Sequence, residues 1–231
     1  STFMRWEAIE EFEIYASRGT LERVRALLYD VVLRGKKTPM PLRLIETKPG
    51  VVFEAEDFTV TAFPVTHRGA DSLGYIFEEK SRRPFLAEKA DALGVPFGPE
   101  RKALVNGEAI TLPDGRRITS DEVLGDWEKG AKLVVVGDTG RTDNLVEVCM
   151  DADTLVIEST YLDEEEQMAG QFSHLTAKMG AELAKKAGVK KLILTHLSRR
   201  YRGKDVLAEA QTVFQDTVVA RDFDTFVIKK D

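Results

Sequence analysis

Three side chains that can bind a metal each follow a strand-like run of apolar residues. His67 ends FPVTH, Asp138 lies in VVVGDTG, and His196 lies in ILTHLSRRY. A metal site in a hydrolase needs neutral imidazoles and a carboxylate that converge from separate strand ends, and this trio has that chemistry. Taken singly, each histidine could instead be a satisfied, partly buried imidazole, and Asp138 could be a turn residue that caps a helix over 141–148.

The chain contains few histidines and cysteines that could bind a metal. It contains three histidines, the third being His174, and one cysteine, Cys149. Neither an HxH pair nor a CxxC motif is present, so a two-zinc site would need further ligands. A single cysteine excludes an internal disulfide framework. Cys149 lies in the apolar stretch NLVEVCM, where we expect a buried small hydrophobic residue rather than a nucleophile.

Length and charge define the general class. The chain has 231 residues, 43% of them hydrophobic, so it can bury a sizeable core in one domain with an excursion. No run of about 18 apolar residues and no signal peptide is found, so we expect a cytoplasmic protein without a membrane segment. Because the net charge is −6, phosphate binding must depend on local basic patches. Two clusters qualify, unless they are ordinary solvated surface: Arg199, Arg200, Arg202 and Lys204, and, in the middle of the chain, Lys80, Arg82, Arg83, Lys89, Arg101, Lys102, Arg116 and Arg117.

Strand-like and helix-like segments alternate, which is typical of a layered α/β fold. Strands are predicted over 11–16, 42–47, 51–55, 58–65, 73–79, 132–139, 153–160 and 190–196. Helices are predicted over 20–33 with Thr20 as N-cap, 141–148, 175–188 with Gly188 as C-cap, and 206–214. Residues of about 80 to 119 break the alternation with prolines, glycines and charges around one short helix at 85–95. We therefore expect a body formed by 1–79 and 120–231, and an insertion at 80–119 that is either functional or disordered.

Four motifs, GDTG, ESTY, SHLTA and LTHLSRRY, follow one another along the second half of the chain. Their order and contexts resemble the ribonuclease Z family, the tRNA 3′-processing endoribonucleases of the metallo-β-lactamase superfamily. The resemblance is nearly continuous from His67 to VARDFDTFVI near the C-terminus. It implies an α/β fold, the metallo-β-lactamase-like αββα sandwich, that is N-terminally incomplete because the family's HxHxDH motif would precede Ser1. It also implies that 80–119 is a flexible arm that grips tRNA, with Gly98 and Pro99 as its Gly-Pro motif.

The resemblance also implies metal ligands and catalytic residues. His67, Asp138 and His196 would hold metal, with Asp138 bridging two zinc ions. His174 would protonate the departing ribose 3′ oxygen beside a phosphate bound at the N-terminus of the following helix, and Glu158 would orient His174.

Two positions depart from the family's motifs, and three more residues are implied to contact RNA. Leu175 replaces the serine of the family's His-Ser-Thr, and Ile157 replaces the histidine of its His-Glu-Ala-Thr. Arg199, Arg200 and Tyr201 would contact RNA near the cleavage site. The alternative for Tyr201 is a hydroxyl that pins a loop.

The function implied by the resemblance is a zinc-dependent endoribonuclease that removes the 3′ trailer from precursor tRNA and leaves a tRNA 3′-hydroxyl. The complete active site would hold two Zn²⁺ ions, and the protein would be a homodimer. With three candidate ligands, this chain alone is expected to be inactive and to hold at most one defined zinc. Two alternatives remain open. One is another phosphodiesterase of the same superfamily, which would not need the arm. The other is a non-catalytic partner subunit, since the main histidine cluster is missing.

Overall fold

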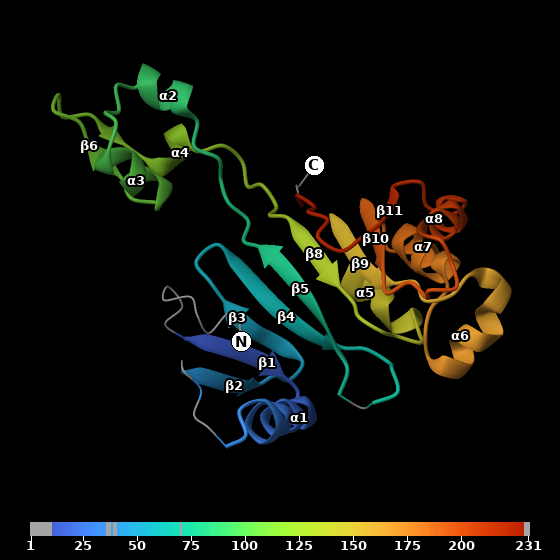
Figure 1. The fold of residues 1–231 in the computed structure, drawn as a ribbon. Helices are drawn as coiled ribbons and strands as arrows, with labels where there is room; N and C mark the ends of the chain where they lie inside the picture. Colours follow the sequence, from blue (N-terminus) through green and yellow to red (C-terminus); the bar gives the residue numbers. More distant parts are fainter. Residues whose placement is uncertain (1–10, 36–37, 39–40, 70, 229–231) are drawn as a thin grey trace. The chain divides into compact units, whose positions relative to one another are not determined.

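The computed structural model describes residues 11–35, 38, 41–69 and 71–228 and divides the chain into two compact units (Figure 1). Unit 1 comprises the described residues of 1–78 and 131–231, and unit 2 comprises 79–130. The first ten residues of the expected body lie outside the described residues. Unit 2 continues beyond the expected limit at 119, because Arg82 and Glu128 form an antiparallel bridge near its ends.

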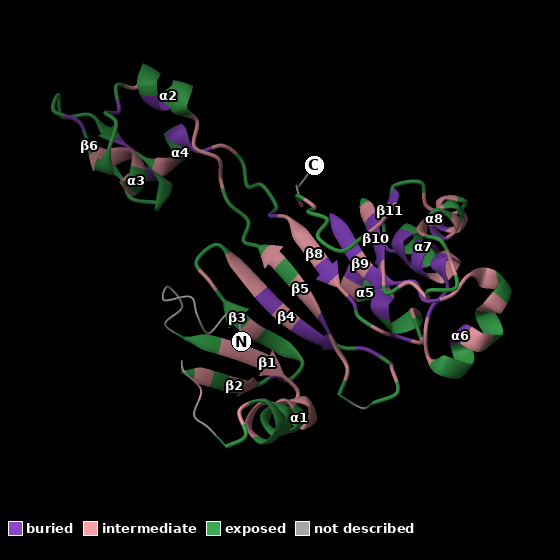
Figure 2. Ribbon diagram, in the orientation of Figure 1, coloured by how far each residue is buried: buried purple, intermediate pink, exposed green. Residues whose placement is uncertain are grey.

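A seven-stranded mixed sheet forms the centre of unit 1, with the order β11-β10-β9-β8-β5-β4-β3. Its strands are β3 Gly50–Glu54, β4 Phe58–Pro64, β5 Leu73–Glu79, β8 Lys132–Val135, β9 Thr154–Glu158, β10 Lys191–Thr195 and β11 Thr217–Val219. Strands β8 to β11 are parallel, whereas β8 pairs with β5, and β3 with β4, in antiparallel fashion. Most buried residues of the parallel strands are branched and apolar, the exceptions being Thr154, Glu158 and Thr217, and Figure 2 shows how much of these strands is buried.

The second half of the chain contains the helices of unit 1 that lie beside the parallel strands or in the loops between them. They are η3 Asp143–Leu145, α5 Val146–Cys149, η4 Asp163–Glu165, α6 Glu166–Phe172, α7 Ala177–Lys186 and α8 Gly203–Gln211. Helix α7 packs on β9 and β10, and α8 packs on β11. Gly188 follows the α7 C-cap with a positive φ of 65°, as its expected capping role requires. Cys149 is fully buried in this core, and burial raises the pKa of its thiol to about 12, so it is no nucleophile.

The N-terminal part of unit 1 contains the two predicted strands, but its helix differs from the prediction. Strands β1 Phe12–Ala16 and β2 Leu42–Glu46 form a separate parallel pair. The predicted helix over 20–33 consists of α1 Arg18–Ala26 followed by a π-helix, η2 Leu27–Val32. Thr20 is not the N-cap, because the Ser17 hydroxyl accepts the hydrogen bond from the Thr20 N–H.

Unit 2 is folded around a small core of its own. It contains α2 Ala87–Ala92, α3 Pro99–Val105, β6 Ile110–Thr111, β7 Arg117–Ile118 and α4 Ser120–Val123. Strands β6 and β7 pair across the PDG turn, as expected from the sequence. Its buried residues lie far apart along the segment: Ala90, Val95, Leu104, Leu112, Ile118 and Val123. The spacing of these residues explains why the segment appeared irregular, since no short window shows their apolar pattern.

Candidate active site

The carboxyl ends of three parallel strands bring their polar residues to one edge of the sheet. The register of β9 and β10 places Glu158 opposite Thr195, so Glu158 and His196 leave the sheet side by side. Asp138 follows the neighbouring strand β8. His67 follows β4, and His174 lies between α6 and α7. The structure therefore brings together all the residues that the sequence assigned to metal binding and acid–base chemistry.

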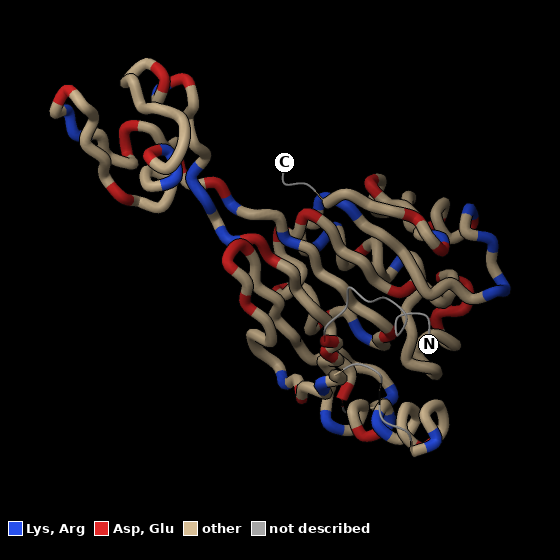
Figure 3. The backbone as a smooth tube through the Cα atoms, turned by 60° about the vertical axis from the view of Figure 1, so that its left-hand side comes forward, with Lys and Arg blue, Asp and Glu red and all other residues tan. Residues whose placement is uncertain are grey.

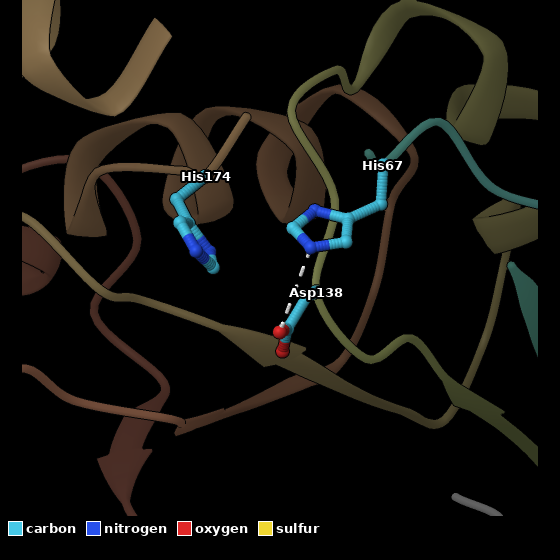
Figure 4. A group of neighbouring side chains, drawn as sticks. All are labelled: His67, Asp138 and His174. Carbon is cyan, nitrogen blue, oxygen red and sulfur yellow. Dashed lines mark ion pairs between the residues drawn. The ribbon is translucent and has the colours of Figure 1, made fainter. Parts of the chain in front are cut away.

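Asp138 lies between the imidazoles of His67 and His196, and Figure 4 shows it with the first of them. Its Oδ2 is 3.9 Å from Nε2 of His67, and its Oδ1 is 3.5 Å from Nε2 of His196. These distances exceed those of hydrogen bonds. They approach the separation of about 3.3 Å between two ligands of a tetrahedral zinc ion with bonds of about 2.0–2.1 Å. Imidazole nitrogens and a carboxylate are also the donor types that zinc accepts, so the residues present fit a zinc ion.

The alternative role for Asp138, as a helix cap, does not match the structure. The helical segment that follows begins at Asp143 with Thr142 as its N-cap. Asp138 instead has a half-exposed carboxylate that faces the imidazoles.

The tautomer of His67 follows from its second hydrogen-bond partner. Nδ1 of His67 lies 2.9 Å from the backbone carbonyl oxygen of Ser173. A carbonyl can only accept, so Nδ1 carries the proton and donates. The lone pair is then on Nε2, the nitrogen that faces Asp138 and the one available to a metal.

His174 lies between the other two histidines and pairs with Glu158. Its Nδ1 is 2.8 Å from Glu158 Oε1. Its ring centroid is 5.1 Å from that of His67 and 5.3 Å from that of His196. One ligand atom each of His67, Asp138 and His174 also lie within 4.8 Å of one another, so His174 is within reach of the same ion. The assignment of His174 as an acid rather than a ligand therefore stays a prediction.

Glu158 is fully buried and accepts hydrogen bonds from several donors. Its Oε1 accepts from the backbone N–H of Thr139 at 2.9 Å as well as from His174. Its Oε2 accepts from the Leu175 N–H at 3.2 Å and from both the N–H and the hydroxyl of Thr160. A buried carboxylate is tolerated only with such compensation. Glu158 thus fixes three loops of the site at once.

Sequence reasoning missed Thr160. Its hydroxyl lies 2.6 Å from Glu158 Oε2 and 2.8 Å from Nδ1 of His196. The only sequence signal for Thr160 was its position in ESTY, two residues after Glu158. A buried threonine in a strand-to-loop turn has no distinctive sequence pattern. The parallel pairing of β9 with β10 creates the contact with His196.

The helix start near His174 needs correction. Helix α7 begins at Ala177 after the N-cap Thr176, whose hydroxyl accepts from the Met179 N–H at 3.2 Å. His174 therefore lies in the preceding loop and not at the helix N-terminus. Leu175, which stands in place of the family's serine, is a buried core residue and offers nothing to a phosphate.

A polar cavity of about 400 Å³ adjoins the metal-ligand candidates. His67 and Asp138 line one part of it, and Ser17, Thr20 and Arg23 of the α1 region line another. It offers room for a polar group of a substrate beside Asp138.

The residues predicted to contact RNA in LSRRY have different environments. Arg199 is exposed. Arg200 is exposed but pairs with Glu165 at 3.1 Å. Tyr201 packs against the main core, and its buried hydroxyl has no hydrogen-bond partner among the described residues. The alternative role of the Tyr201 hydroxyl in pinning a loop is therefore not seen in the part of the chain that is described.

Gly98 and Pro99 lie on the surface of unit 2, where they also have a structural role. Gly98 has a φ of 125°, a region that favours glycine, and Pro99 opens helix α3. Basic and acidic residues are interspersed along this unit (Figure 3). Three of its arginines, Arg83, Arg101 and Arg116, pair with aspartates, which reduces the basic patch expected from the sequence.

Comparison with solved structures identifies the fold. The chain is similar to human tRNase Z, short form, with a TM-score of 0.60 and 22% identity over 96% of this chain and 70% of that one. It is also similar to the metallo-β-lactamase fold protein YhfI from Bacillus subtilis, with a TM-score of 0.59 and 18% identity over 95% of this chain and 67% of that one. The predicted fold class, a metallo-β-lactamase-like α/β sandwich, is confirmed.

Curated relatives identify the family. A ribonuclease Z from Bradyrhizobium sp. (strain ORS 278) is 41% identical over 228 residues, which are 99% of this chain and 75% of that protein. A ribonuclease Z from Listeria innocua serovar 6a is 41% identical over 222 residues, 94% of this chain and 71% of that protein. No protein-family model matches the chain. The chain belongs to the ribonuclease Z family, as its ordered motifs predicted.

Gly140 gives a prediction about the geometry of the site. A Cβ on Gly140 would lie 2.8 Å from Cα of Ser173, whose carbonyl holds His67. We expect Gly140→Ala to lower the free energy of unfolding by about 1–3 kcal/mol, because a backbone atom must move. Urea unfolding followed by circular dichroism measures the change.

Gly137→Ala is the matched control. It precedes Asp138 in the same loop, and its Cβ would meet nothing within 4 Å. We expect a change within about 0.5 kcal/mol. Equal destabilisation by the two substitutions would contradict the close packing of Gly140 against the His174 loop.

Proposed function

We propose that this chain forms the active-site part of a zinc-dependent endoribonuclease that removes the 3′ trailer from precursor tRNA and leaves a tRNA 3′-hydroxyl. The observation that carries the proposal is the convergence of His67, Asp138, His174 and His196 at one sheet edge. The names of the relatives, ribonuclease Z, and of the similar human structure, tRNase Z, support the substrate class.

His67, Asp138 and His196 would hold Zn²⁺ through Nε2, carboxylate oxygen and Nε2. Bound zinc would supply a Lewis acid that activates the attacking water. Asp138 is suited to bridge two ions, because its two oxygens face different histidines. The proposed complete site holds two zinc ions and therefore uses ligands beyond those described.

His174 would act on the leaving group. When water attacks the phosphorus, the bond to the ribose 3′ oxygen breaks, and that oxygen needs a proton. Protonated His174 would donate it from Nε2, while Glu158 accepts the Nδ1–H and stabilises the imidazolium. The 5′-phosphorylated trailer and the tRNA 3′-hydroxyl are then the products.

RNA recognition would use two regions. Arg199, Arg200 and Tyr201 follow His196 and would contact RNA near the cleaved bond. Gly98 and Pro99, exposed on unit 2, would also contact the precursor tRNA. In addition, we propose a cytoplasmic homodimer. None of the described helices has the length and apolar character to cross a membrane.

His174→Ala separates the proposed acid from a ligand. In the protein as its gene encodes it, we expect this variant to keep its zinc and near-normal tRNA affinity, while single-turnover cleavage falls about 10²–10⁴-fold, the range for loss of a general acid. The buried Glu158 still has backbone donors in this variant, which limits its structural effect.

The comparison variant is His196→Ala, which we expect to lose zinc as well as activity. Zinc content, tRNA affinity and cleavage rate are measured on both proteins. Loss of zinc from His174→Ala would make His174 a ligand, and an unchanged rate would remove its catalytic role.

Unit 2 gives the second functional prediction. Arg82 and Glu128 exchange backbone hydrogen bonds of 3.0 and 2.8 Å, so a two-residue Asn-Gly turn can replace residues 83–127 between them. We expect this deletion to weaken binding of precursor tRNA while leaving hydrolysis of bis(p-nitrophenyl) phosphate largely intact, because the catalytic residues belong to unit 1.

The deletion also distinguishes the tRNA enzyme from another phosphodiesterase of the superfamily. Unchanged tRNA binding would contradict the role of unit 2 in recognition. Equal loss of both activities would show that the segment only supports the fold.

A further inference from the structure

Thr160 occupies an unusual position between a buried carboxylate and a candidate metal ligand. Its side chain is largely buried, with the residue 9% exposed. Its hydroxyl oxygen lies 2.6 Å from Glu158 Oε2 and 2.8 Å from Nδ1 of His196. It also lies 3.2 Å from the backbone carbonyl oxygen of His196. A hydroxyl has one proton, so its direction can be worked out from these neighbours.

The proton of Thr160 points to Glu158. Glu158 accepts from the backbone N–H groups of Thr139 and Leu175, which can only donate, so its oxygens act as acceptors. The contact at 2.6 Å is shorter than that to the His196 carbonyl and involves a charged acceptor, which makes it the stronger bond.

The direction of that bond fixes the His196 ring. Because the Thr160 proton is committed to Glu158, the contact of 2.8 Å with Nδ1 requires His196 to donate Nδ1–H to the Thr160 oxygen. Nε2 is then unprotonated and faces Asp138 Oδ1 at 3.5 Å. His174 does not compete strongly for Thr160, since its Nδ1 is 3.3 Å from that oxygen but 2.8 Å from Glu158 Oε1.

We infer that Thr160 is a positioning residue. It donates its hydroxyl proton to Glu158 and accepts a hydrogen bond from Nδ1 of His196, and so it holds His196 in the Nδ1–H tautomer required for metal binding through Nε2. Glu158 thereby orients two imidazoles, His174 directly and His196 through Thr160. The metal-binding consequence rests on the proposed function, whereas the tautomer does not.

Thr160→Val tests the inference, because valine keeps the shape and removes the hydroxyl. The tautomers of the histidines are read from long-range ¹H–¹⁵N correlations of the metal-free chain in alkaline solution, where only three imidazoles contribute signals. We expect the Nδ1–H tautomer of His196 in the unmodified chain and a shift toward Nε2–H in Thr160→Val. Competition with a chromophoric chelator should show zinc affinity about 10–100-fold weaker, the usual effect of losing such an outer partner.

Two further variants serve as controls. Thr160→Ser keeps a hydroxyl and should preserve both the tautomer and the zinc affinity. Thr195→Val removes a hydroxyl one residue before His196 and should also preserve both. Among the described residues, this hydroxyl donates one hydrogen bond, to the Ile157 carbonyl oxygen at 3.5 Å.

The outcomes separate the inference from the proposed function. Nε2–H in the unmodified chain, or an unchanged tautomer and zinc affinity in folded Thr160→Val, would overturn the inference. A tautomer shift in a chain that binds no zinc before substitution would support the role of Thr160 and count against the proposed metal site. If Thr160→Val does not fold, the tautomer of the unmodified chain and of Thr160→Ser still decides the matter.

Discussion

The buried carboxylate of Glu158 is the constraint on which the site depends. A charged group without solvent must be surrounded by donors, and here they come from Thr139 after β8, from Thr160 after β9, and from the His174–Leu175 loop before α7. If any one of these loops moves, the Glu158 carboxylate loses a hydrogen-bond donor. The geometry of the site is therefore coupled to the stability of the surrounding core.

The same arrangement gives each imidazole a defined orientation. Nδ1 of His67 is satisfied by a backbone carbonyl, Nδ1 of His174 by Glu158, and Nδ1 of His196 by the Thr160 hydroxyl. In all three rings these hydrogen bonds use Nδ1, so Nε2 is the nitrogen that remains for a metal or a substrate. Around a metal, fixed tautomers of this kind reduce the rearrangement that binding requires.

The amino-acid sequence predicted which candidate site residues lie together better than it predicted their supporting contacts. Asp138 and His196 each follow an apolar strand of the parallel set, whose carboxyl ends share an edge, and His67 follows the antiparallel strand β4. The resemblance to the family, rather than these patterns alone, favoured the metal-ligand role. Thr160 was missed because its role arises from the pairing of β9 with β10, a relation between segments distant along the chain. Glu158 and Thr195 are far apart in the sequence, so the sequence alone does not indicate that they lie opposite each other in the sheet.

Local sequence signals were less exact for the first helix and for unit 2. The helix predicted over 20–33 ends in a π-helix at Leu27–Val32, and its cap is Ser17 rather than Thr20. Unit 2 appeared irregular because its core joins Ala90 to residues as distant as Val123. In contrast, Gly188 and the PDG turn were predicted correctly, since a helix end and a hairpin turn depend on adjacent residues.

The most direct test of the account is where zinc binds. Crystals of the chain grown with Zn²⁺ and measured on both sides of the zinc absorption edge would locate the ion without assumptions about activity. The account predicts an anomalous peak about 2.0–2.1 Å from Nε2 of His67 or His196 and from a carboxylate oxygen of Asp138. A zinc ion bound through Nδ1 of these histidines, one bound by Glu158, or the absence of a peak at this edge of the sheet would contradict it.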